Sequence, residues 1–244
     1  MLMKIRIFLL ITTLALIGTA CKKEVAGNDN LTPQQGFVSG RVVDTQGNPI
    51  ANASIVVNNT QYYNHNILGR TDASGRYKLE LTPGSWYIRG TTEIKFDNKR
   101  YVLDLYSETD VAFSGTEGAV RNLSLKIAGE RTGEFGDVGY YGGQIEVVGL
   151  GIDTEAVELT LQPVGALMDG MTGKSLTAKP DRMYIDDVPL GKYTITARYG
   201  ADRKPLRLRI LDSDRAYGSS LTASFDPAYS GAQGRYKLNV EVAE

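Results

Sequence analysis

The sequence predicts an all-β fold: a β-sandwich followed by a second, similar β-sandwich. Beyond residue 36 the chain is rich in Val, Ile, Tyr and Thr, and apolar residues recur at every second position. That period is typical of strands with one buried face. Gly, Asp, Asn and Pro separate the runs, and no window of 12 residues carries a helical apolar stripe. Short alternating runs with frequent turn residues favour sandwiches over helical folds.

Three runs in the first half of the chain predict strands. Residues 76–81 read RYKLEL, so that apolar and charged side chains alternate. Residues 38–42 and 53–57 alternate in the same way. Residues 44–49 and 72–75 are rich in Asp and Gly and predict turns, since Asp accepts hydrogen bonds from nearby backbone and Gly adopts positive φ at low cost.

The same part of the chain carries a spaced set of turn and core residues: Gly40, Val42, Asp44, Gly47, Pro49, Ile50, Ala53, Ile55, Thr71, Asp72, Gly75, Tyr77 and Leu79. This pattern resembles the carboxypeptidase regulatory-like domain, most densely over residues 37–92. The resemblance implies a seven-stranded Greek-key sandwich, similar to that of transthyretin (prealbumin), over residues 37–129. It also implies a non-catalytic module, often found attached to peptidases, surface receptors and carbohydrate-handling lipoproteins.

A second sandwich is predicted over residues 143–244. The motif at residues 83–88 has an echo at 190–195, with Trp86 and Tyr193 each two residues after a glycine. Trp86 lies in phase with Ile88, which predicts a place in the core. Residues 130–142 contain four glycines and several charges and are expected to be a linker. Further alternating runs predict strands at 144–147, 157–161, 206–210 and 236–242.

The N-terminus predicts a secretory signal peptide over residues 1–20. Lys4 and Arg6 precede an apolar run at residues 7–17, and small residues lead to Cys21, the only cysteine. A cysteine at the cleavage point resembles a bacterial lipoprotein signal, in which the thiol receives lipid such as palmitate. A transmembrane anchor is the alternative, but about eleven apolar residues fall short of the roughly twenty that span a bilayer. Residues 21–36 are expected to form the lipidated cysteine and a flexible tether.

The charge and the residues around Cys21 indicate an envelope protein. Of 27 basic residues, loss of Lys4 and Arg6 leaves 25 against 28 acidic ones, a balance that gives no electrostatic reason to bind nucleic acid. The mature chain cannot form an internal disulfide. We expect an outer-membrane lipoprotein, held in the membrane by the acyl chains on Cys21. The surface and periplasmic faces both stay open.

Catalytic chemistry is not predicted, and neither a metal nor a cofactor is expected. His65 is the only histidine, whereas metallocarboxypeptidases hold zinc with two histidines and a glutamate. There is no Gly-x-Ser-x-Gly motif for a serine nucleophile. Asp186 and Asp187 are neighbours on a predicted strand and should point to opposite faces. Residues 212–214 could contribute to a calcium site, but a turn is the better interpretation.

Four tyrosines in loops are candidate contacts for a ligand or partner: Tyr62, Tyr63, Tyr140 and Tyr141. Aromatic rings in loops can stack on a sugar or peptide, but tyrosine also covers sandwich edges. The leading hypothesis is a non-enzymatic, lipid-anchored accessory protein of the cell envelope with binding or assembly modules. The alternative is a carbohydrate-binding module of an outer-membrane glycan-uptake system. A third hypothesis is a structural role, in which a sandwich pairs with a membrane receptor or another envelope protein.

Overall fold

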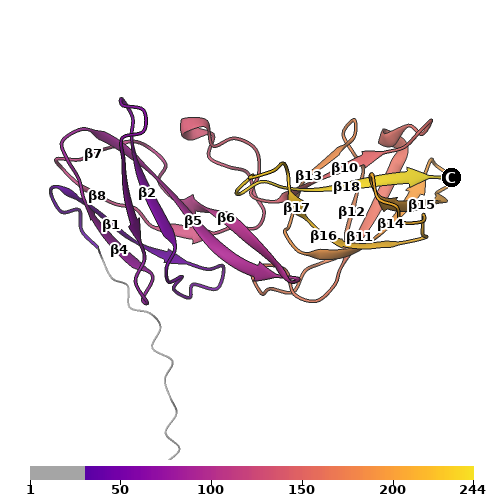
Figure 1. Cartoon of the computed structure of the whole chain (residues 1–244), viewed down its shortest axis with the longest axis horizontal. Coiled ribbons are helices and arrows are strands. Elements are labelled where there is room, and N and C mark those ends of the chain that lie inside the picture. The colour runs from indigo at the N-terminus through magenta and orange to yellow at the C-terminus, as the bar shows by residue number, and fades with distance from the viewer. Residues whose placement is uncertain (1–30) are drawn as a thin grey trace, which may run out of the picture. The chain divides into compact units, whose positions relative to one another are not determined.

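The computed structural model describes residues 31–244 (Figure 1), so the predicted signal peptide and Cys21 lie outside the described residues. Two 3-10 turns, η1 (Glu134–Gly136) and η2 (Thr154–Ala156), accompany the strands. No helix within this part of the chain is long and apolar enough to cross a membrane. The strands of the first sandwich are β1 (Phe37–Val43), β2 (Ser54–Asn59), β3 (Asn66–Arg70), β4 (Arg76–Glu80), β5 (Ser85–Phe96), β6 (Lys99–Ser107), β7 (Phe113–Ser114), β8 (Ala119–Val120) and β9 (Leu123–Leu125).

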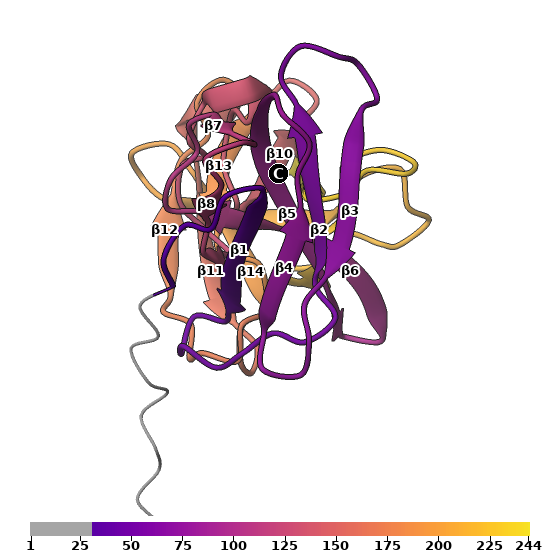
Figure 2. The ribbon, with the colours of Figure 1, turned by 90° about the vertical axis from the view of Figure 1, so that its left-hand side faces the viewer.

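The first sandwich has the strand order β3-β2-β5-β6-β9-β1-β4, with β7 beside β5 and β8 beside β1 (Figure 2). Strand β6 belongs to both layers. Its first part, up to Asp104, pairs with β5, and Leu105–Ser107 pair with β9. A strand that passes from one layer to the other closes the sandwich around one core. The seven strands of this path confirm the sandwich predicted for the first half of the chain.

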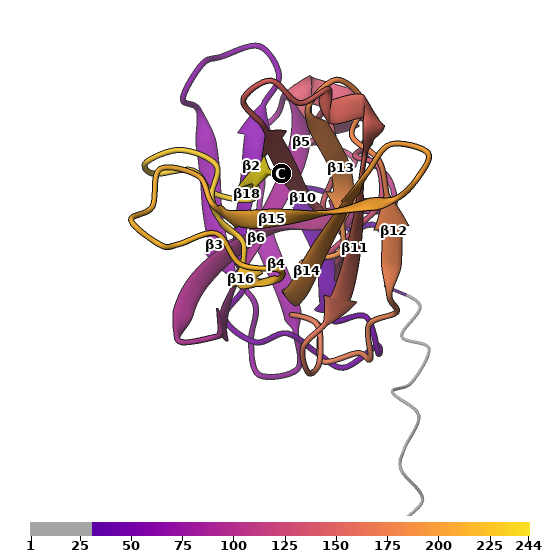
Figure 3. The same cartoon turned by 90° about the vertical axis from the view of Figure 1, so that its right-hand side faces the viewer.

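The second sandwich repeats this order strand for strand (Figure 3). Its path is β12-β11-β14-β15-β18-β10-β13, and β16 pairs with β14 as β7 pairs with β5. Strand β15 changes layers as β6 does, because Lys204–Leu206 pair with β14 and Arg207–Ile210 with β18. The strands are β10 (Gly143–Val148), β11 (Val157–Pro163), β12 (Leu176–Ala178), β13 (Tyr184–Val188), β14 (Lys192–Tyr199), β15 (Lys204–Ile210), β16 (Leu221–Ser224), β17 (Asp226–Pro227) and β18 (Tyr236–Ala243).

The alternating runs lie on strands as predicted, with their apolar residues inside. Val38 and Val42 on β1, and Ile55 and Val57 on β2, are fully buried. Strand β10 and strand β18 alternate between buried and half-buried positions along their whole length. An alternating strand buries one face against the opposite layer, so the apolar positions of the sequence pattern are the positions that form the core.

Trp86 and Tyr193 begin equivalent strands, β5 and β14, and both are buried. The indole Nε1 of Trp86 donates to the carbonyl of Thr82 at 3.0 Å. The hydroxyl of Tyr193 donates to the carbonyl of Pro189 at 2.7 Å. In each case the acceptor is four residues upstream, and the buried polar atom is satisfied. The predicted core position of Trp86 is confirmed.

Gly40 on β1 leaves room for a buried hydrogen bond. Directly beside Gly40, the hydroxyl of Tyr77 on β4 donates to the carbonyl of Arg121. A Cβ on Gly40 would lie 1.8 Å from that carbonyl oxygen and 2.7 Å from the Tyr77 hydroxyl. Burial raises the pKa of Tyr77, so the hydroxyl keeps the proton that it donates. The hydrogen bond of Tyr77 therefore requires a residue without a Cβ at position 40.

We predict that Gly40→Ala lowers the free energy of unfolding by about 3 kcal/mol, since a backbone carbonyl must move to admit the methyl group. Urea unfolding of the purified protein measures the loss. Gly47→Ala is the matched control: its φ is +81°, but a Cβ there meets nothing within 4 Å. It should lose about 1 kcal/mol, from backbone strain alone. Equal losses in the two variants would contradict the packing argument.

Candidate functional site

The predicted linker is a folded hairpin that joins the two sandwiches. Glu130 and Tyr140 form a β-bridge across it, and Arg131 N donates to Gly139 O at 2.8 Å. Tyr141 N donates to Gly129 O at 2.9 Å, and η1 (Glu134–Gly136) lies at the tip. We call residues 129–141 the connecting hairpin.

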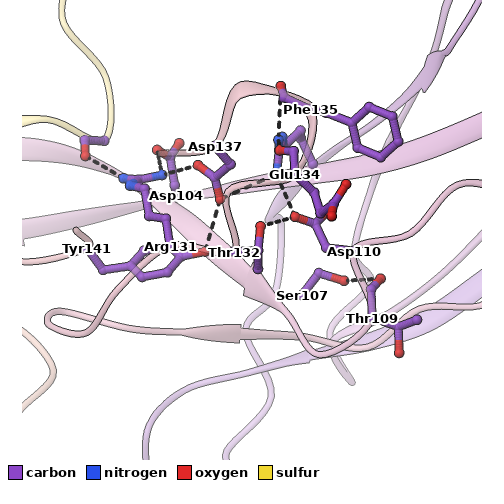
Figure 4. A network of polar contacts seen from close by, with 12 residues as sticks. Asp104, Ser107, Thr109, Asp110, Arg131, Thr132, Glu134, Phe135, Asp137 and Tyr141 are labelled. Atoms are coloured by element: carbon purple, nitrogen blue, oxygen red, sulfur yellow. Dashed lines mark hydrogen bonds and ion pairs between the residues drawn. The ribbon is translucent and has the colours of Figure 1, made fainter. Parts of the chain in front are cut away.

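Arg131 lies at the centre of this region with only 2% of its side chain exposed (Figure 4). Its Nη1 lies 2.8 Å from both Asp137 Oδ1 and Asp104 Oδ2. Nε donates to the carbonyl of Tyr140 at 3.0 Å, and Nη2 to that of Gly234 at 2.8 Å. Burial opposes the charge, but hydrogen bonds and attraction from the two carboxylates raise the pKa of Arg131. The guanidinium is thus surrounded by acceptors from the hairpin, β6 and the second sandwich.

A second arginine, Arg89 on β5, extends this cluster along the first sandwich. Its Nη1 lies 3.5 Å from Asp110 Oδ2 and 3.4 Å from Asp137 Oδ2. The hydroxyl of Thr132 also donates to Asp110 Oδ2. Asp110 is buried, and no donor in the described part of the chain reaches its Oδ1. The two arginines therefore share Asp137 and link the connecting hairpin to β5 and β6; we call Arg89, Asp104, Asp110, Arg131, Thr132 and Asp137 the junction cluster.

Aromatic contacts fix the tip of the connecting hairpin on the first sandwich. The ring of Phe135 stacks on that of Tyr87, with centroids 4.2 Å apart and planes at 9°. Arg89 Nη2 donates to the carbonyl of Glu134 at 2.8 Å beside this stack. Such stacking adds roughly 1 kcal/mol to the burial of the rings themselves. The hairpin is held at its tip as well as at its base.

Strand β6 also contacts the second sandwich directly. The hydroxyl of Tyr236 accepts from Val102 N at 2.8 Å and donates to Val102 O at 2.9 Å. Tyr101 donates to the carbonyl of Phe225 at 2.8 Å, and its ring lies 5.1 Å from that of Tyr236. Gly234 N reaches Val102 O at 2.9 Å, and a Cβ on Gly234 would lie 1.9 Å from Asp104 Oδ2. Tyr236 and Gly234 together satisfy the backbone N–H and carbonyl of Val102 on β6.

The turn between β5 and β6 carries charged residues that reach the second sandwich. Asp97 Oδ1 accepts from Lys192 Nζ at 2.8 Å, and Oδ2 accepts from the hydroxyl of Ser224 at 2.6 Å. These two hydrogen bonds hold the pKa of Asp97 below its ordinary value. Lys99 Nζ lies 2.5 Å from Asp226 Oδ1. Asp97 and Lys99 therefore have charges complementary to Lys192 on β14 and Asp226 on β17.

The structure separates the four candidate tyrosines. Tyr62 and Tyr63 are 66% and 98% exposed, in the loop between β2 and β3, and Tyr140 is 40% exposed. Tyr141 differs from the expectation of a loop ring open to a ligand, since only 4% of it is exposed. Its ring packs against the Arg131 guanidinium at 4.5 Å. Contact of the three exposed rings with a ligand stays a prediction.

The carboxylates of Asp186 and Asp187 accept hydrogen bonds from different groups, a side-chain amide and a backbone N–H. Asp186 Oδ1 accepts from Gln144 Nε2 at 2.8 Å, whereas Asp187 Oδ1 accepts from Gly129 N at 2.7 Å. His65 is exposed, with its ring 5.4 Å from that of Trp86. Within residues 31–244 no three His, Cys, Asp or Glu side chains converge as metal ligands would. The junction cluster was not predicted from the sequence, in which the basic and acidic residues of a glycine-rich segment are its one local signal.

We predict that Arg131→Met lowers the free energy of unfolding by about 3 kcal/mol, because it leaves Asp104 without its cation and Asp137 with Arg89 alone. Arg100→Met is the matched control. Arg100 pairs with Glu93 on the surface, and loss of such a pair costs about 0.5 kcal/mol. Urea unfolding of both variants at neutral pH measures the difference. A loss in Arg131→Met no larger than that of the control would show that the buried pair does not hold the junction.

Known proteins resemble this chain in two ways. Residues 38–101 match the family of the carboxypeptidase regulatory-like domain, which confirms the resemblance seen in the first half of the sequence. No curated protein matches the chain. The matched residues run from β1 into β6, so this family covers most of the first sandwich and none of the second.

Several solved structures are similar to this chain at low identity and low TM-score. The Bacillus anthracis TIE protein is 13% identical with a TM-score of 0.32, over 85% of this chain and 34% of that one. A streptococcal ancillary pilin is 11% identical with a TM-score of 0.27, over 84% of this chain and 62% of that one. A B repeat unit of the collagen-binding surface protein of Staphylococcus aureus is 8% identical with a TM-score of 0.25, over 86% of this chain and 98% of that one. This chain thus spans about a third of the TIE chain and under two thirds of the pilin. Residues 38–101 thus match the model of the carboxypeptidase regulatory-like domain, and a second sandwich of the same strand order follows them.

Proposed function

We propose that this protein is a non-enzymatic, lipid-anchored accessory protein of the bacterial cell envelope, in which two joined β-sandwiches serve binding or assembly. The observation that carries the proposal is Cys21, placed directly after a basic and then apolar N-terminus and ahead of the sandwiches. Several acyl chains, at about 0.8 kcal/mol for each buried methylene, would hold such a protein firmly in a membrane. The regulatory-like domain at residues 38–101 and the single histidine support a role outside catalysis.

The outer membrane is the proposed location. Lys22, Lys23 and Glu24 follow the cysteine, and an aspartate directly after it would be the familiar signal for retention in the inner membrane. Protease treatment of intact cells, followed by immunoblotting, decides between the two faces. Loss of the protein without lysis indicates the cell surface, whereas protection until the outer membrane is broken indicates the periplasmic face.

We predict that Cys21→Ser releases the protein from membranes, because serine offers no thiol for the lipid. Fractionation of cells by ultracentrifugation, with a carbonate wash, measures the membrane-bound share. Thr13→Ser, within the apolar run, is the control and should stay in the membrane fraction. If Cys21→Ser still sediments after the wash, the anchor proposed here is wrong.

A carbohydrate-binding role is the second candidate, favoured by the exposed rings of Tyr62 and Tyr63. Adjacent exposed tyrosines in one loop present flat surfaces that can stack on sugar rings. We predict that a glycan array detects binding to the wild-type protein. Tyr62→Ala and Tyr63→Ala together should weaken it about tenfold, at roughly 1 kcal/mol or less for each ring. Tyr229→Ala, which also removes an exposed tyrosine, is the control, and an array without any bound glycan rejects this role.

A further inference from the structure

A cavity of about 500 Å³ lies on the second sandwich beside the turn between β5 and β6. Strand β18 lines one side with Lys237 and Asn239, and β16 and β17 line another. The loop after β15 contributes Arg215, and the turn contributes Asp97 and Lys99. We call it the basic cavity. Its volume lies within the range of small-molecule sites in proteins.

The basic cavity has more positive than negative side chains. Four cations and two carboxylates line it: Lys99, Lys192, Arg215, Lys237, Asp97 and Asp226. Both carboxylates are already paired within the wall, Asp97 with Lys192 and Asp226 with Lys99. An anion entering the cavity would therefore meet cations whose charge these pairs do not cancel.

Arg215 is the cation of the wall that has no carboxylate partner among the described residues. Lys237 pairs with Glu146, which does not line the cavity. No carboxylate among residues 31–244 pairs with Arg215, and its side chain is exposed. An arginine with free donors is suited to a planar, two-oxygen anion such as a carboxylate, since it can offer two parallel hydrogen bonds.

The wall also contains an acceptor that lacks a donor. Asn239 Oδ1 is buried and receives no hydrogen bond from the described residues. The neighbouring hydroxyls are engaged, since Ser224 donates to Asp97 and Thr222 bonds to Thr194. A buried acceptor without a donor costs roughly 1–3 kcal/mol, and a ligand hydroxyl would satisfy it once the Asn239 amide turns this oxygen toward the cavity. The cavity is therefore complementary to a small molecule that carries both an anionic group and a hydroxyl donor.

We propose that the basic cavity binds a sugar acid, a uronate residue of an acidic glycan, with its carboxylate at Arg215 and a ring hydroxyl donating to Asn239 Oδ1. The proposal rests on the binding role proposed above and gives it a ligand class. It concerns a different surface from the Tyr62 and Tyr63 loop. An acidic peptide could supply the carboxylate, but a sugar acid carries a carboxylate and several hydroxyl donors on one ring, which suits Arg215 and Asn239 together.

Calorimetric titration of the purified full chain tests the proposal. The probes are oligosaccharides of galacturonate, of mannuronate and of hyaluronan, with neutral galactose oligomers of equal length and poly-L-glutamate as comparisons. At least one uronate probe should bind at least tenfold more tightly than both comparisons, and added salt should weaken it. If no uronate probe binds, or poly-L-glutamate binds equally well, the proposal is overturned.

Variants place the binding in the basic cavity. Arg215→Ala and Asn239→Leu should each weaken the uronate probe about tenfold, the value of one hydrogen bond to a charged or buried group. Arg70→Ala, which changes an exposed arginine of the first sandwich, is the matched control and should bind as the wild type does. Thermal unfolding of each variant verifies the fold, and unchanged affinity in folded Arg215→Ala and Asn239→Leu overturns the proposal. Membrane fractionation of the Cys21 variant is independent of this assay, so failure of the anchor and failure of the cavity give different results.

Discussion

One buried guanidinium, that of Arg131, makes the connecting hairpin, the first sandwich and the second sandwich depend on one another. An arginine keeps its charge in proteins and offers donors in a fixed plane, so burial requires acceptors on several sides. Asp137 comes from the hairpin itself, Asp104 from β6 and the Gly234 carbonyl from the loop before β18. If any of these elements moves away, a buried charge or acceptor loses its partner. The glycine at 234 belongs to the same constraint, since a side chain there would meet Asp104.

Charge and packing have different roles at this junction. A buried ion pair costs desolvation, and well-packed apolar residues in its place are often equally stable. The stabilising contacts are therefore the buried rings of Tyr101, Phe225 and Tyr236, which join the cores of the two sandwiches. Apolar surfaces alone would allow the two sandwiches to pack against each other in several registers. We infer that the directed hydrogen bonds of Arg131 and of the Tyr236 hydroxyl select one of them.

The sequence predicted the strands because their cause is local. Alternation of apolar and polar residues is visible in any short window, and the same alternation decides which face of β1, β4 or β18 is buried. The sequence predicts a linker over residues 130–142, and its glycines fit a loose chain as well as a hairpin. Gly133, Gly136 and Gly139 have positive φ, so here they make tight turns rather than a loose chain. Two partners of Arg131 lie far from it in the sequence, Gly234 at 103 residues and Asp104 on β6, where no local pattern could reveal them.

Tyr140 and Tyr141 show what could have been predicted within that segment. Successive residues of an extended chain point to opposite faces, so two adjacent tyrosines on one arm of a hairpin cannot both face solvent once the hairpin packs on a sandwich. Tyr141 is the inner one and covers Arg131, whereas Tyr140 is partly exposed. Had the hairpin been predicted, alternation along its arm would have indicated that one of the two tyrosines is buried and the other exposed.

The junction and the basic cavity share one element, which ties binding to the way the sandwiches are joined. Strand β6 contacts the second sandwich through Tyr101 and Val102, and the turn just before it places Asp97 and Lys99 in the cavity wall. Asp97 neutralises Lys192, and Lys99 neutralises Asp226. If the turn moved away, each of those partners would lose its counter-charge and the cavity would lose one wall. A ligand that needs the complete wall binds only the joined state, and by mass action it stabilises that state against separation. The hairpin β5–β6 thus makes the shape of the cavity a property of both sandwiches.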